Sequence, residues 1–83
     1  MISIRDFQEQ PIDKQIHLLY EHGSCVMTIR YYGYRVNLYL MSDFYLEVFY
    51  HHKKDLIEKI VPFDVQNSRI NFYTDQIRLP ATF

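Results

Sequence analysis

The sequence lacks several of the residues on which common classes of site depend. Its 83 residues include two glycines, three prolines, one cysteine and no tryptophan. Two glycines are too few for a glycine-rich phosphate-binding loop. Cys25 has no second cysteine for a disulfide within the chain, and this usage is typical of a protein kept in a reducing compartment.

Long apolar runs and an excess of positive charge are also missing. No apolar run approaches the roughly 18 residues that a membrane-spanning helix needs, and the segment Met1–Asp6 lacks the apolar block of a secretory signal. We therefore expect a cytoplasmic protein without membrane contact. Nine Lys and Arg stand against ten Asp and Glu. A nonspecific nucleic-acid binder normally has a basic excess, so nucleic acid is not the expected partner.

Aromatic and aliphatic residues, by contrast, are abundant. Hydrophobic residues make up 48% of the chain, and eight Tyr with six Phe bring the aromatic content to 17%. A disordered chain has far fewer. A chain of this length has room for one core, so we expect residues 1–83 to form a single domain.

The first part of the chain has the pattern of two short helices. Ser3 can cap a helical turn over 3–10, and Pro11 suits the first position of a second helix over 11–22. Gly23 is expected to end that helix in a left-handed conformation. Along 11–22 an apolar stripe recurs with helical spacing, formed by Ile12, Ile16, Leu19 and Tyr20.

The middle of the chain has the composition of strands, rich in β-branched and aromatic residues. Short breaks divide it into four expected strands, over 24–32, 34–41, 44–51 and 56–63. Connections this short cannot cross over a sheet, so the strands should form an antiparallel meander.

The C-terminal part is open between two alternatives. The favoured one is a short helix capped by Ser68, with Ile70, Tyr73 and Ile77 on one side. The other is a strand over 69–74. With either ending, the expected fold class is α+β.

The strand register follows from placing the apolar residues on one core face. Leu40 is expected opposite Phe44 across a three-residue loop, Met41-Ser42-Asp43, with Asp43 in a left-handed bulge position. A two-residue Ser42-Asp43 loop would place Leu40 opposite Tyr45 and divide the core between two faces. The predicted core face holds Val36, Leu38, Leu40, Phe44, Leu46 and Val48.

The outer strands complete this face. Tyr31 is expected opposite Tyr34 across a Tyr32-Gly33 turn, which brings Cys25, Met27 and Ile29 onto the core face and makes Cys25 a buried, unreactive thiol. In the fourth strand, a β-bulge between Ile57 and Ile60 would bring both to one face.

Parts of this pattern resemble other proteins. Residues 38–40 (Leu-Tyr-Leu) and 44–50 (Phe-Tyr-Leu-Glu-Val-Phe-Tyr), followed by Ile57, Ile60 and Phe63, are similar to small uncharacterised bacterial proteins of about this length, as is the helix over 11–22 that ends at Gly23. The resemblance implies an α+β fold with a meander sheet. It implies no activity.

The reactive side chains do not form a recognisable catalytic or metal-binding pattern. His51 and His52 are adjacent and would point to opposite faces of a strand, and His17 and His22 are five residues apart, not the four that align ligands on a helix. No Ser-His-Asp order or paired-acid spacing is present. We therefore expect no enzyme activity, no metal and no cofactor.

The sheet face opposite the predicted core is unusually aromatic, and its candidate binding residues are Arg35, Tyr39, Tyr45, Glu47 and Phe49. In the predicted register Tyr39 faces Tyr45, while Glu47 lies opposite Asn37 and diagonal to Arg35. An aromatic patch of this kind is usually covered. The cover could be the segment 68–83, a second copy of the chain or another ligand.

Two functions fit this surface. The first is a non-enzymatic protein-interaction module, most simply a homodimer built through this face or a sheet edge, because a small domain buries more surface by pairing. The alternative is a domain that binds a small ligand or a single-stranded nucleic acid by stacking on Tyr39, Tyr45 and Phe49.

Overall fold

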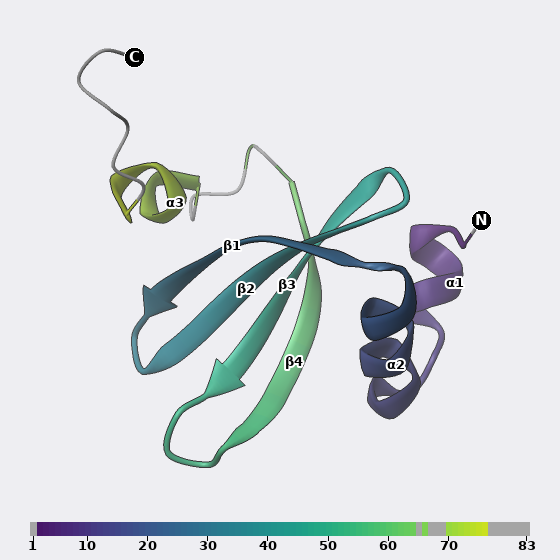
Figure 1. Ribbon diagram of the computed structural model, residues 1–83, viewed down its shortest axis with the longest axis horizontal. Helices are drawn as coiled ribbons and strands as arrows, with labels where there is room; N and C mark the ends of the chain where they lie inside the picture. The colour runs from purple at the N-terminus through teal and green to yellow at the C-terminus, as the bar shows by residue number, and fades with distance from the viewer. Residues whose placement is uncertain (1, 65, 67–69, 77–83) are drawn as a thin grey trace.

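The computed structural model describes residues 2–64, 66 and 70–76, and this part of the chain folds as an antiparallel sheet with short helices (Figure 1). The strands follow one another in the order β1-β2-β3-β4, which confirms the α+β class and the meander. In chain order the elements are α1 (Ile4–Gln8), α2 (Ile12–His22), β1 (Ser24–Tyr31), β2 (Tyr34–Met41), β3 (Phe44–His51), β4 (Leu56–Phe63) and α3 (Ile70–Gln76).

The C-terminal element is a helix, so the favoured alternative is confirmed over Ile70–Gln76 and the strand over 69–74 is wrong. Ser68, the expected cap, and Ile77 lie outside the described residues.

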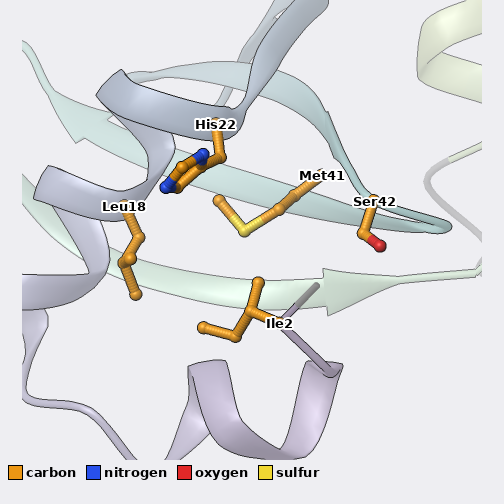
Figure 2. Close-up of a pocket in the computed structure, with 5 residues that line it drawn as sticks. All are labelled: Ile2, Leu18, His22, Met41 and Ser42. Atoms are coloured by element: carbon orange, nitrogen blue, oxygen red, sulfur yellow. The ribbon is translucent and has the colours of Figure 1, made fainter.

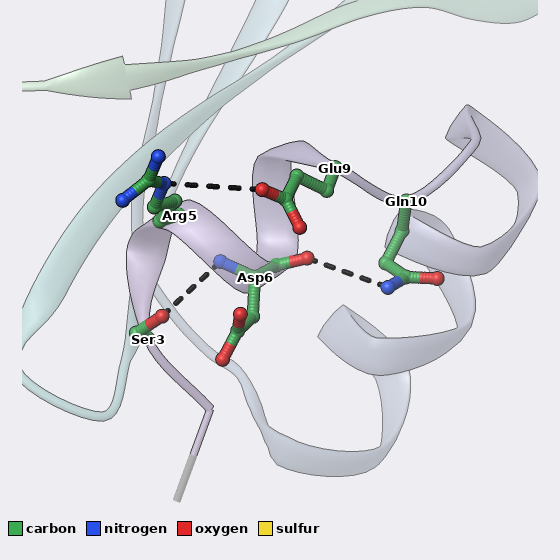
Figure 3. Close-up of polar contacts among 5 residues, drawn as sticks. All are labelled: Ser3, Arg5, Asp6, Glu9 and Gln10. Carbon is green, nitrogen blue, oxygen red and sulfur yellow. Dashed lines mark hydrogen bonds and ion pairs between the residues drawn. The ribbon is translucent and has the colours of Figure 1, made fainter.

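Polar contacts of side chains stabilise α1 and the residues that flank it (Figure 3), and two further hydrogen bonds join α1 to α2. The Asp6 backbone N–H donates to Ser3 Oγ at 3.1 Å, as expected of an N-cap. Pro11 then precedes α2 as its N-cap residue. The Gln15 side chain donates to the carbonyl oxygens of Phe7 and Gln10, at 3.1 and 2.9 Å. These bonds satisfy carbonyls at the end of α1 and hold the two helices together.

Gly23 ends α2, but not by the expected mechanism. Its φ is −90° and its ψ 156°, an extended conformation that any residue can adopt. A Cβ at this position would lie 2.8 Å from the carbonyl oxygen of Leu19 and 3.2 Å from a ring carbon of Tyr39. The glycine is therefore needed because a Cβ would clash with the last turn of α2 and crowd Tyr39 of β2, and the predicted left-handed stop is wrong.

The first hairpin confirms the predicted turn and corrects one strand end. Tyr31 pairs with Tyr34, and Tyr32 and Gly33 have φ values of 47° and 83°, as in a type I′ turn. A bulge then shifts the register between Cys25 and Met27. Met27 stays on the predicted face, but Cys25 moves to the other face and is exposed. The predicted burial of Cys25 is wrong.

The second hairpin has the shorter of the two loops considered. Leu40 pairs with Tyr45, so the loop is the two residues Ser42 and Asp43. Ser42 rather than Asp43 has a positive φ, of 58°. The predicted three-residue loop is therefore wrong, because it is one residue too long. A shift of one residue in the register moves every side chain of a strand to the opposite face of the sheet.

The bulge predicted in the fourth strand is confirmed. Phe49 pairs with Lys59 and Tyr50 with Ile57, which leaves Glu58 as the extra residue. Ile57 and Ile60 consequently share one face of the sheet, because their partners Tyr50 and Val48 do.

The core is divided between the two faces of the sheet. On one face, here called the helix-pair face, Phe7 of α1 and Leu19 of α2 are buried with Met41, Leu46 and Val48. On the other, the α3 face, Tyr73 of α3 is buried with Ile29, Val36, Leu38, Phe49 and Phe63. In Figure 1, α1 and α2 lie together and α3 lies apart from them. Each fully buried side chain of this size contributes about 1.5–3 kcal/mol of transfer free energy, so both faces stabilise the sheet.

Candidate functional site

The five predicted site residues do not form one cluster. Because the β2–β3 register is displaced by one residue, Arg35 and Tyr39 lie on the helix-pair face, while Tyr45, Glu47 and Phe49 lie on the α3 face. The expectation that Tyr39 faces Tyr45 is wrong, since Tyr39 pairs with Leu46.

Glu47 has a structural position beneath α3. It is 0% exposed and lies between Leu38 and Val61, its cross-strand neighbours. The Tyr73 hydroxyl donates a hydrogen bond of 3.0 Å to Glu47 Oε2, which connects α3 to the centre of β3. The predicted neighbours of Glu47 are therefore wrong: Asn37 instead accepts a 2.7 Å hydrogen bond from the Thr28 hydroxyl on the helix-pair face.

Phe49 is a core residue of the α3 face. Only 2% of it is exposed, and its ring makes edge contacts with Tyr31 and Tyr34 at centroid distances of 6.4 and 5.6 Å. Lys59 Nζ lies 4.6 Å from the same ring centroid, a cation–π contact. Phe49 is therefore not available for stacking with a ligand.

A shallow apolar groove remains open beside α3. It encloses about 210 Å³, and Tyr45, which is 37% exposed, is the one predicted site residue that lines it. The other lining residues are Val26, Met27, Leu38, Phe63 and Ile70. α3 thus covers part of the face whose cover the sequence left open, and the groove lies beside it.

The helix-pair face has a cleft between α2 and the sheet, here called the tyrosine cleft. Its volume is about 150 Å³. Ile16, Leu19, Val48 and Ile57 give it apolar walls, and Tyr20, Tyr39, Tyr50 and Asn37 complete the lining. Burial, with smaller effects from Cys25 and Tyr20, raises the pKa of the Tyr39 hydroxyl above its usual value.

Two arginines lie side by side next to this cleft. Arg30 pairs with Arg35 across β1 and β2, and Arg35 pairs in turn with Tyr50, which lines the cleft. Like charges directly opposite one another on a sheet repel. The pair could have been read from the sequence, because a Tyr32-Gly33 turn that places Tyr31 opposite Tyr34 also places Arg30 opposite Arg35. That Tyr20 of α2 lines the cleft could not be read from the sequence.

A larger hollow of about 320 Å³ lies where the helices meet the β2–β3 loop. Figure 2 shows Ile2, Leu18, His22, Met41 and Ser42 around it. His22 lies 3.6 Å from the Glu21 carboxylate at the end of α2. The imidazole thus has a local partner, and the rest of the lining is mainly apolar.

The two edge strands of the sheet differ in their protection. β4 carries Pro62, the bulged Glu58 and Lys59, which are the features that keep a sheet edge from pairing with another strand. β1 is bulged only at its start. From Met27 to Tyr31 its register is regular, without proline or lysine.

Within the described residues, no group of three or more His, Cys, Asp and Glu could hold a metal ion. In the same part of the chain, every helix is too short or too polar to cross a membrane.

No protein-family model, curated protein or solved structure gives a significant match to the chain. We therefore infer function from the surfaces described above.

Proposed function

We propose that the protein is a non-enzymatic interaction module that forms a homodimer through the β1 edge of its sheet. The observation that carries the proposal is the contrast between the two edges. β4 has a proline, a bulge and a lysine, whereas β1 is regular from Met27 to Tyr31. A regular edge strand is a template for pairing with another strand.

The hairpin geometry indicates which groups of β1 would form the interface. The residues that flank a two-residue loop exchange both backbone hydrogen bonds, so Tyr31 is bonded to Tyr34. Bonded pairs alternate along an antiparallel ladder, which makes Ile29 the next bonded residue. Thr28 lies between Ile29 and the following bonded residue, Met27, so the N–H and C=O groups of Thr28 point away from β2, toward the edge.

A two-fold axis at Ile29 would pair the outward-pointing N–H and C=O groups of Thr28 with backbone groups of the partner chain. It would also give favourable side-chain contacts. Thr28 would lie opposite the partner's Arg30, which avoids placing like charges opposite each other. Val26 would lie near the partner's Tyr32. These two residues are 48% and 80% exposed in the single chain, so the pairing would bury apolar surface at both ends of the interface.

The alternative function, stacking of a nucleic acid or ligand on Tyr39, Tyr45 and Phe49, has less support. Tyr39 lies on the opposite face from the other two, and Phe49 is 2% exposed. The three rings do not form one surface.

The proposal is tested by two substitutions at Thr28, compared in sedimentation equilibrium over a concentration series. Thr28→Pro removes the edge N–H, and Thr28→Val keeps it; both lose the side-chain hydrogen bond to Asn37. We expect wild type and Thr28→Val to be dimers and Thr28→Pro to be a folded monomer by circular dichroism.

Two outcomes would contradict the proposal. A wild-type chain that stays monomeric throughout the series rules out the homodimer. A folded Thr28→Pro variant that still dimerises shows that the interface lies elsewhere, for instance at the groove beside α3.

A further inference from the structure

We propose that the tyrosine cleft and the adjoining Arg35 form a binding site for a single-ring aromatic carboxylate. This site lies on the helix-pair face and is distinct from the β1 edge. It does not depend on the homodimer proposed above.

The size and walls of the cleft suit one aromatic ring. Its volume of about 150 Å³ matches the roughly 150 Å³ apolar cavity that is known to accept benzene. α2 supplies one wall through Ile16 and Tyr20, and the sheet supplies the other through Val48 and Ile57. Apolar walls with a few polar groups at fixed positions are characteristic of sites for small molecules.

One polar group of the lining is in place to orient a ligand. The Thr28 hydroxyl donates to Asn37 Oδ1 at 2.7 Å, so the Asn37 oxygen is engaged. The NH2 group of the same side chain remains as a donor on the lining of the cleft.

Arg35 provides a charge that an anion would neutralise. Arg35 pairs across the ladder with Tyr50 and is two residues from Asn37 on the same face, and both of these line the cleft. No carboxylate among the described residues lies within ion-pair distance of Arg35. Cβ atoms of directly opposed residues are about 4.5–5.5 Å apart, so the Arg35 side chain is within reach of the Tyr50 end of the cleft. Arginine binds carboxylates through paired, charge-assisted hydrogen bonds.

The test compares three probes by calorimetry and by amide shifts in NMR spectra. Benzoate has the ring and the charge, benzyl alcohol has the ring alone, and acetate has the charge alone. We expect saturable binding of benzoate in the millimolar range or tighter, with shifts at Asn37 and Tyr50. Binding of the other two probes should be at least about tenfold weaker.

Two variants separate the parts of the site. Arg35→Gln should weaken benzoate about tenfold and leave benzyl alcohol unchanged. Tyr20→Ala should weaken both ring compounds and keep the fold, because Tyr20 is 87% exposed. Failure of benzoate to saturate the wild-type protein, equal binding of all three probes, or undiminished benzoate affinity in Arg35→Gln would overturn the proposal. Benzoate binding is measured at protein concentrations below and above the midpoint of any dimerisation, so the outcome is independent of the dimer.

Discussion

At the scale of single residues, the two glycines serve different purposes, and substitutions should distinguish them. Gly33 has a φ of +83° and open space around it, whereas Gly23 has an ordinary φ and close neighbours. Gly33→Asn should be better tolerated than Gly33→Ala, because Asn adopts the left-handed conformation more readily.

At Gly23 the order should reverse. Ala should cost about 1–3 kcal/mol through crowding against Leu19 and Tyr39, and the larger Asn should cost more. Urea denaturation of the four variants measures this. If Asn is the milder change at both sites, Gly23 is required for its backbone conformation and the steric explanation is wrong.

The buried Glu47–Tyr73 hydrogen bond provides a second prediction at this scale. Tyr73→Phe removes the hydroxyl that donates to Glu47 and keeps the ring that packs on Phe63 at a centroid distance of 5.3 Å. Removing the donor of a buried hydrogen bond costs about 1–3 kcal/mol, so we expect the unfolding free energy to fall by that amount.

The matched control is Tyr34→Phe, which removes a 2.8 Å hydrogen bond to the exposed Glu58 carboxylate. The solvated carboxylate can bond to water instead, so the loss should be below about 1 kcal/mol. Equal losses in the two variants would mean that burial of Glu47 does not strengthen its bond to Tyr73.

At the scale of elements, much could be predicted from composition and local pattern. The strand bounds follow from β-branched and aromatic runs between short breaks, and the bulge at Glu58 follows from the three-residue spacing of Ile57 and Ile60. These are local signals that need no knowledge of the rest of the chain.

The β2–β3 register could not be predicted in the same way. The prediction that places Val36, Leu38 and Leu40 of β2 on one face with Phe44, Leu46 and Val48 of β3 requires a three-residue loop. With helices on both faces of the sheet, Val36 and Leu38 are buried against one helix layer while Leu46 and Val48 are buried against the other. A division of this kind depends on long-range packing of α2 and α3, which local periodicity does not report. The candidate site residues were divided for the same reason.

The loop itself provides a test of the register. Ser42 has a φ of 58°, so Ser42→Gly should relieve left-handed strain and be neutral or stabilising by up to about 1 kcal/mol. Asp43→Gly gains nothing of this kind and should be destabilising by about 0.4–1 kcal/mol through the entropy of the unfolded chain. The reverse order in denaturant melts would support the three-residue loop with Asp43 in the left-handed position.

At the scale of the whole molecule, one thin sheet separates two small cores, and each core depends on helices from a different end of the chain. α1 and α2 precede the sheet in the sequence, and α3 follows it. A substitution on either face should therefore weaken the shared sheet and lower the stability of the whole chain. In a sheet with one solvated face, by contrast, substitutions at half of the positions would hardly change the stability.

Two aromatic residues on the α3 face of β3 make this testable together with the oligomeric state. Phe49 is 2% exposed and Tyr45 is 37% exposed. Phe49→Lys removes a core aromatic and introduces a buried charge, so its unfolding free energy should fall by at least about 3 kcal/mol. Tyr45→Lys keeps its charge near solvent and should cost less than half as much.

Thermal melts over a series of protein concentrations separate folding from association. Binding of a second copy to the folded chain raises the melting temperature with concentration, so a β1-edge dimer predicts that the wild-type midpoint rises along the series. Tyr45→Lys should keep this rise, because Tyr45 is on β3, inside the sheet and away from the β1 edge. Phe49→Lys should melt lower at every concentration. A wild-type midpoint independent of concentration would contradict the dimer, and loss of the concentration dependence in Tyr45→Lys alone would move the interface from the β1 edge to the groove beside α3.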